Sequence, residues 1–167
     1  AVNRSIGLGF PELLRAFMRQ DPDVILVGEI RDTETGQVAA EAALTGHLVF
    51  ATLHTSRSLQ AMTRMLQLGV QGYMLGPALQ GVLAQRLVLR ICKSCRVPYK
   101  PSREVLERHF EFEGDPDVQF YRGAGCKECH ETGFRGRVGI HELVAPNMEV
   151  RGLLIEGAPL TKIAEAA

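Results

Sequence analysis

Two short apolar segments of the chain end in side chains that can handle metal or phosphate. In "DVILVGEIRD", at positions 23–32, the apolar residues stop at Gly28 and Glu29 follows at once. The segment "HLVFATLHT" ends in the same way, with His54 and Thr55. Ligands of open parallel sheets bind beyond the carboxyl ends of strands, so these side chains are expected on one rim. A carboxylate there can hold Mg²⁺ through water or orient an attacking water, and a polar neighbour can sense a γ-phosphate.

Each of these polar residues also has a structural interpretation. Glu29 could simply favour the N-terminal dipole of the next helix. The Thr-Glu pair at 33–34 already serves that purpose, which favours a functional role for Glu29. His54 fits a functional role and an ordinary hydrogen-bonded strand end equally well. Arg31 and Asp32 are expected either to form a local ion pair or to position Glu29.

The loop that would cradle a phosphate is missing from the sequence. No G-x-x-x-x-G-K-[ST] occurs in it. The one glycine-rich candidate, "GLGF" at 7–10, lacks the lysine and indicates a turn before a helix. By itself the chain is therefore expected to bind a nucleoside triphosphate poorly.

All four cysteines fall in two C-x-x-C pairs, Cys92 with Cys95 and Cys126 with Cys129. Each pair predicts a tight turn that presents two thiolates, and together they predict a closed, structural Cys₄ zinc site. The 30 residues between the pairs leave room for an inserted helix. The alternatives are two disulfides or four unrelated thiols, which the cysteine-free, enzyme-like first ninety residues disfavour. His130 could replace one cysteine as a ligand.

Apolar periodicity predicts an α/β fold around these residues. Strands are expected at "DVILV", "HLVFATL" and "RVGIHELV", and their alternation with helices is typical of a parallel sheet covered by helices. The helix after the first strand should be capped by Thr33 and stopped by Gly46. The other segments with helical spacing are "GFPELLRAFMRQ", "SLQAMTRMLQLGV", "YMLGPALQGVLAQRLVLRI" (kinked or started at Gly76-Pro77), "SREVLERHFEF" and the end of the chain from "NMEVRGLL" onward.

Composition narrows the class of protein. The chain has 167 residues, with 19 Lys and Arg against 19 Asp and Glu, so no net field favours nucleic acid or an anionic membrane surface. No apolar run approaches the roughly 18 residues of a membrane span, and the first residues lack a signal-peptide layout. A soluble intracellular protein is expected. Because the chain begins without Met, it is expected to be a segment of something longer.

Three segments resemble one known family in the order that the family has them. "RQDPDVILVGEIRDTETGQVAAEAALTGHLVFATLHT", "VLAQRLVLRICKSC" and "GAGCKECHETGFRGRVGIHELV" are similar to the secretion ATPases of type II secretion and type IV pilus assembly. The resemblance implies the carboxyl-terminal part of a RecA-like P-loop ATPase domain, with a small inserted Cys₄ zinc element and a helical carboxyl-terminal tail. It also implies ATP hydrolysis with Mg²⁺ by a homo-hexamer at the cytoplasmic face of the inner membrane.

The resemblance assigns roles to particular residues. Glu29 matches the Walker B acid, and residues 46–55 match the histidine box, whose second histidine is His54. The predicted nucleotide-binding residues are Gly28, Glu29, His54, Thr55, Gln85 and Arg86. The family's Walker A loop and acidic box precede the Walker B strand, so they are expected upstream of Ala1. Arg57 departs from the small or polar residues usual after "LHT" and adds a charge beside the site.

Three parts are expected along the chain: a partial ATPase core at 1–91, a zinc element at 92–136, and a returning strand with carboxyl-terminal helices at 137–167. The main hypothesis is a motor ATPase segment that works with inner-membrane platform proteins, without nucleic acid and without inserting into the membrane. The main alternative is a non-catalytic, zinc-dependent module that docks on a membrane assembly platform. A nucleic-acid-translocating RecA-like protein is a weaker third hypothesis.

Overall fold

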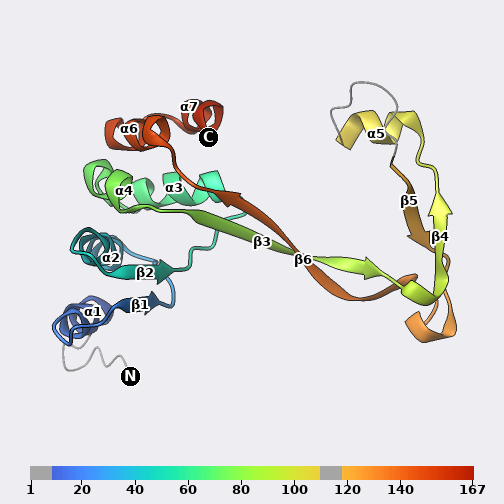
Figure 1. Ribbon diagram of the computed structural model, residues 1–167, viewed down its shortest axis with the longest axis horizontal. Coiled ribbons are helices and arrows are strands. Elements are labelled where there is room, and N and C mark those ends of the chain that lie inside the picture. Colours follow the sequence, from blue (N-terminus) through green and yellow to red (C-terminus); the bar gives the residue numbers. More distant parts are fainter. Residues whose placement is uncertain (1–8, 110–117) are drawn as a thin grey trace. The chain divides into compact units, whose positions relative to one another are not determined.

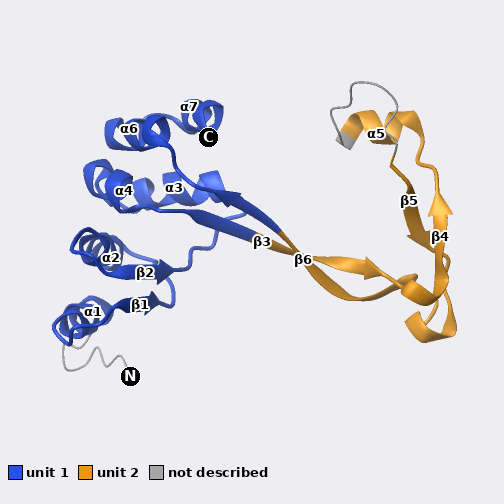
Figure 2. Cartoon of the chain, viewed as in Figure 1, with its two compact units in different colours: residues 1–84, 141–167 blue, residues 85–140 orange. Residues whose placement is uncertain are grey.

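The computed structural model describes residues 9–109 and 118–167, and the chain divides into two compact units. Unit 1 comprises residues 1–84 and 141–167, and unit 2 comprises residues 85–140 (Figure 2). Segments from both ends of the sequence therefore build unit 1, and unit 2 contains all four cysteines.

A strand–helix–strand motif organises unit 1 (Figure 1). It consists of β1 (Val24–Val27), α2 (Thr33–Leu44) and β2 (Leu48–Ala51). The two strands are parallel and pair along their whole length, from Val24 with Leu48 onward. The parallel arrangement expected from the sequence is confirmed, and the carboxyl ends of both strands lie at one edge.

The cap of α2 differs from the prediction. The N-cap is Asp32, whose side chain accepts a hydrogen bond from the backbone N–H of Thr35 at 2.8 Å. Thr33 is instead the first helical residue, and its hydroxyl donates to the carbonyl of Leu68 at 2.5 Å. Aspartate is a strong N-cap, and the tertiary acceptor for Thr33 was not visible in the sequence. The predicted stop is confirmed, since α2 ends just before Gly46, which has φ +102°.

The described part of unit 1 contains five more helices, which confirm the helices predicted near the start and at the end of the chain. They are α1 (Phe10–Met18), α3 (Ser58–Gln67), α4 (Gly72–Ala78), α6 (Met148–Glu156) and α7 (Leu160–Ala166). The first half of "GLGF" lies outside the described residues, and Gly9 is the N-cap of α1. Within the described ranges, no helix has both the length and the apolar character needed to cross a membrane.

The core of unit 1 forms where these helices meet β1. Val27, Val38, Met62, Leu154 and Ile163 are each at most 1% exposed and belong to one apolar cluster. These residues come from β1, α2, α3, α6 and α7, so the carboxyl-terminal helices are part of the same core as the first strand.

The predicted helix at 73–91 is wrong over its second half. α4 ends at Ala78, and β3 (Val82–Ile91) follows. Pro77 lies in the last turn of α4, where it cannot donate a backbone hydrogen bond to residue i−4. β3 is a hydrogen-bonded neighbour of β6 (Phe134–Val144), and Figure 1 shows the two strands running in opposite directions. Leucines spaced four apart suit a helix, but pairing with a strand far along the chain decided the conformation.

Unit 2 contains a second antiparallel pair and the cysteine turns. β4 (Arg96–Tyr99) pairs with β5 (Phe120–Gly123). α5 (Arg103–His109) confirms the start of the helix predicted between the cysteine pairs, and the rest of that segment lies outside the described residues. The 3₁₀ turns Lys93–Cys95 and Lys127–Cys129 each end on the second cysteine of a C-x-x-C pair, and the first cysteine is the N-cap.

One close backbone approach in unit 1 gives a stability prediction. A Cβ at Gly72, the first residue of α4, would lie 2.2 Å from the carbonyl oxygen of Leu154 on α6. Gly72→Ala should therefore force the two helices apart and lower the free energy of unfolding by about 2 kcal/mol or more. Denaturant unfolding measures this change.

Gly152, on α6, supplies the matched control for this experiment. A Cβ there would meet nothing within 4 Å, so Gly152→Ala should stabilise the protein by up to about 1 kcal/mol through helix propensity. Equal effects of the two substitutions would contradict the close packing of α4 against α6.

Candidate functional site

Glu29 and His54 meet at the carboxyl edge of the β1–β2 pair. Glu29 lies two residues beyond β1, and His54 lies three residues beyond β2. Glu29 Oε1 is 3.1 Å from His54 Nε2. The expectation that these two strand ends share a rim is therefore met by a direct contact between the two side chains.

Backbone contacts between the strand ends brace this edge. The Ile30 N–H donates to the Thr52 carbonyl at 3.0 Å, and the Thr52 hydroxyl donates to the Gly28 carbonyl. These bonds extend the strand pairing past β1 and β2 and fix the chain on both sides of Glu29. Gly28 thus contributes a carbonyl oxygen to the scaffold of the site.

The Glu29 carboxylate is charged and held by two donors. Arg31 Nη2 lies 2.5 Å from its Oε2, and the hydrogen bond from Arg31 is the main reason that the pKa of Glu29 lies below its usual value. The Glu29 side chain is only 21% exposed, whereas His54 is 84% exposed. A half-buried, ionised carboxylate beside an accessible imidazole suits the binding of a hydrated cation or the orientation of a water molecule.

Arg31 and Asp32 were expected either to form an ion pair with each other or to position Glu29, and the structure shows a different role for each. Asp32 caps α2 through the N–H of Thr35, and Arg31 binds Glu29. Arg31 is therefore a partner of the candidate acid. Its spacing of two residues from Glu29 was the signal in the sequence, since residues at that spacing lie on the same side of an extended chain.

The positions of the other predicted nucleotide-binding residues do not test their predicted role. The Thr55 hydroxyl donates to the Arg57 carbonyl at 3.4 Å, and Arg57 occupies the N-cap position of α3. Gln85 and Arg86 lie on β3 in unit 2. Their relation to Glu29 and His54 remains a prediction.

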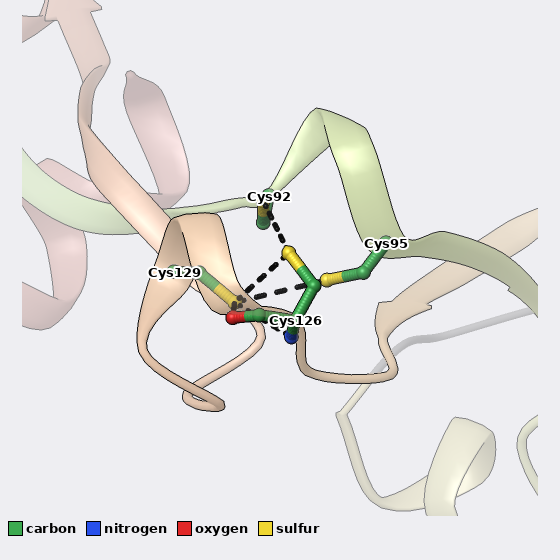
Figure 3. A group of neighbouring side chains, drawn as sticks. All are labelled: Cys92, Cys95, Cys126 and Cys129. Carbon is green, nitrogen blue, oxygen red and sulfur yellow. Dashed lines mark hydrogen bonds between the residues drawn. The ribbon is translucent and has the colours of Figure 1, made fainter.

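The four cysteine sulfurs gather in one cluster (Figure 3). Each Sγ lies within 4.8 Å of the others, although the two pairs are far apart in the sequence. The Sγ–Sγ distance is 3.9 Å from Cys92 to Cys126, 3.9 Å from Cys95 to Cys129, and 3.7 Å from Cys126 to Cys129.

These distances fit a tetrahedral zinc ion and exclude disulfides. Four sulfurs bound at about 2.3 Å in a tetrahedron lie about 3.8 Å apart, whereas a disulfide needs about 2.05 Å. All four cysteines are free. His130 follows Cys129 in the left-handed conformation, and the cluster found among the described residues consists of the four cysteines alone. The donor set therefore fits one structural zinc with every position filled.

Backbone N–H groups stabilise negative charge on the cluster. Burial opposes ionisation of the Cys129 thiol, but the N–H groups of Cys126 and Gly133 donate to its sulfur at 3.2 and 3.3 Å. Together with the neighbouring thiols they lower the pKa of Cys129 to about 7. Burial raises the pKa of Cys95 to about 12. Full ionisation of the set therefore requires a cation at its centre.

Glycines allow the cysteine turns to close, a role that the sequence analysis missed. A Cβ at Gly123 would lie 2.0 Å from the Gly133 carbonyl oxygen, and Gly133 has φ +76°. The Cys92 N–H donates to that same carbonyl at 2.9 Å. Two glycines separated by ten positions in a cysteine-rich segment were the signal, since close backbone approach excludes any side chain.

Comparison with known proteins places the chain in a family. The family model described as "Type II/IV secretion system protein" matches residues 1–167. The chain is 49% identical over 170 residues to "Type IV pilus assembly ATPase PilB" of Thermus thermophilus, covering 99% of the chain and 19% of that protein. It is 49% identical over 150 residues to "Type II secretion system protein E" of Aeromonas hydrophila, covering 90% of the chain and 30% of that protein.

Two solved structures share the fold. The "Pilus Retraction Motor PilT and Bound ADP" superposes with a TM-score of 0.59 at 31% identity, covering 94% of the chain and 34% of that protein. The Legionella pneumophila "ATPase DotB" gives a TM-score of 0.59 at 24% identity, covering 95% and 33%. At 24% identity, the match to DotB is evidence for the fold only.

The element order and the shared fold define the class as an α/β protein, with the RecA-like fold that the resemblance to the secretion ATPases implied. The chain belongs to the type II/IV secretion system protein family, as its resemblance to the secretion ATPases implied. It spans about a fifth to a third of the length of the relatives described above.

Proposed function

We propose that this chain is the Walker B and histidine-box segment of a cytoplasmic motor ATPase, and that the full-length protein hydrolyses ATP as a hexamer. The observation that carries the proposal is the 3.1 Å contact between Glu29 and His54 at the carboxyl edge of two parallel strands. Membership of a family whose matching relatives include pilus assembly ATPases supports it.

The residues of the rim have distinct roles in this proposal. Glu29 would orient the attacking water and hold hydrated Mg²⁺, and Arg31 holds the Glu29 carboxylate in place through their ion pair. His54 and Thr55 approach the γ-phosphate, and the resemblance to the secretion ATPases suggests nucleotide contacts for Gln85 and Arg86 as well. When bound with ATP, Mg²⁺ would supply positive charge against the phosphates.

The isolated chain should be inactive, because the phosphate-binding loop would come from another part of the full-length protein. No G-x-x-x-x-G-K-[ST] occurs in the sequence. Leu26 and Phe50, on β1 and β2, are 74% and 55% exposed, whereas parallel strands are normally covered on both faces. Additional polypeptide packed over this apolar surface is consistent with the proposal.

The cysteine cluster would hold a structural zinc ion, and ATP turnover would move partner proteins. In this proposal the hexamer docks on platform proteins at the inner face of the inner membrane and powers type II secretion or type IV pilus assembly. Zinc would shape unit 2, which has few buried apolar residues of its own among those described.

A second candidate is a non-catalytic zinc module that docks on a membrane assembly platform. The observation that favours it is the separation of the cysteine cluster into a compact unit of its own. It predicts binding to a platform protein without any requirement for Glu29.

ATP hydrolysis separates the two candidates. The zinc-loaded full-length protein should hydrolyse ATP and sediment as a hexamer with nucleotide, whereas the chain of 167 residues should do neither. Phosphate release and analytical ultracentrifugation measure these properties. A folded full-length protein that binds the platform but releases no phosphate would favour the docking module.

A further inference from the structure

The loop between β2 and α3 carries His54, and its first half is bonded to the residues that follow β1. Thr52 binds the backbone of Ile30 and Gly28 through its carbonyl and its hydroxyl. The His54 side chain is 84% exposed, so packing contributes little to the position of its ring. The position of the imidazole against Glu29 must therefore depend strongly on how the two ends of the loop are held.

The second end of the loop is held by a residue from a distant strand. Ser58, the first residue of α3, is fully buried, and its hydroxyl donates to Oε1 of Glu142. Glu142 belongs to β6, in the part of that strand that lies in unit 1. A buried hydroxyl without an acceptor would cost about 1–3 kcal/mol, so this bond fixes where α3 begins.

Glu142 also places a carboxylate at the first residue of α3, through its bond with the Ser58 hydroxyl. The N-cap residue of α3, Arg57, makes no side-chain cap hydrogen bond, and the first turn contains no acidic residue. A carboxylate near a helix N-terminus is electrostatically favourable. The Glu142 carboxylate therefore stabilises the start of α3 from outside the helix, only four residues after His54.

We propose that Glu142, acting through Ser58, is a positioning residue that holds His54 against Glu29. The inference rests on the proposed ATPase function, because its consequence is measured in turnover. Glu142 lies more than eighty residues beyond His54 in the sequence, so the acid that sets the geometry of the loop is not part of the histidine-box segment itself.

The test uses Glu142→Ala, Ser58→Ala and the double variant in the full-length protein. Each single substitution should lower kcat about 10- to 100-fold, because a small misplacement of a reacting group has effects of that size. KM for ATP should change less than about threefold, since binding is not the affected step. The double variant should be no worse than the more impaired single variant, because both substitutions break the same bond.

Two further variants separate positioning from general stability. Glu142→Gln keeps an acceptor oxygen for Ser58 and should restore kcat to within about threefold of the wild type. Glu165→Ala removes an exposed acid on α7 and should leave turnover unchanged. Additive losses in the double variant, or an unchanged kcat in Glu142→Ala, would overturn the inference.

The His54 ring resonance, followed by NMR in histidine-labelled full-length protein, keeps the two proposals distinguishable. Glu142→Ala and Ser58→Ala should both shift this resonance, and Glu165→Ala should not. If both variants shift the resonance but the wild-type full-length protein hydrolyses no ATP, the ATPase proposal is refuted and the link from Glu142 to His54 is supported. An unshifted resonance would refute the link.

Discussion

Glu29→Gln should lower the ATP turnover of the full-length protein by about 100- to 10,000-fold, the range expected when a group that guides proton transfer is removed. Glutamine has nearly the shape of glutamate, but it cannot carry the charge that orients water and attracts Mg²⁺. Nucleotide affinity and the unfolding temperature should stay close to wild type. Steady-state phosphate release, nucleotide titration and thermal unfolding measure the three quantities.

The chain offers a matched control for this substitution. Glu34 pairs with Arg15 at 3.1 Å on the surface of unit 1, and its side chain is 55% exposed. Glu34→Gln therefore removes a charge and an ion pair of the same kind as the Glu29–Arg31 pair, at an acid whose partner is Arg15. It should leave turnover within about twofold, as expected for a surface ion pair. Comparable losses from both variants would refute the role assigned to Glu29.

Removing zinc should unfold the cysteine turns of unit 2. Structural zinc sites contribute about 10–16 kcal/mol of apparent binding free energy at pH 7, and this becomes folding free energy. Elemental analysis should find about one zinc per chain. After chelation, or in Cys95→Ser, the amides of β4 and β5 should lose protection from hydrogen exchange, because the Ala124 N–H bonds directly to the Cys95 carbonyl.

His130→Asn is the control for the zinc prediction, and pH gives a second test. Asparagine tolerates the left-handed conformation of His130, so this variant should keep its zinc. All four thiols must lose their protons to bind the metal, so zinc affinity should fall as the pH falls. If His130→Asn loses its zinc, the fourth ligand is His130 and one of the cysteines is not a ligand. Protected amides in metal-free protein would refute the structural role.

Much of the candidate site was predictable because its signals are local. An acid directly after a short apolar strand, and two C-x-x-C pairs, are patterns of neighbouring residues. They specify a strand end and two tight turns whatever the rest of the chain does. The contact of Glu29 with His54 followed from one additional assumption, that the two strands are parallel neighbours.

The errors of prediction came from contacts between distant segments. Leucines spaced four apart favoured a helix through residues 82–91, yet this segment is β3, because its backbone groups pair with β6. Thr33 had the right chemistry for a cap, but its hydroxyl bonds to Leu68, and Asp32 caps the helix. In both segments the local preference was weak enough for a distant partner to decide.

The sequence by itself determined the chemistry available at each site: the carboxylate, the imidazole and the four thiols, with the turns and strand ends that present them. Only the tertiary structure decided which partners hold these groups. The bond from Ser58 to Glu142 joins residues 84 positions apart, whose meeting no local pattern encodes. Periodicity and composition report the preferences of neighbouring residues, whereas such contacts depend on the path of the whole chain.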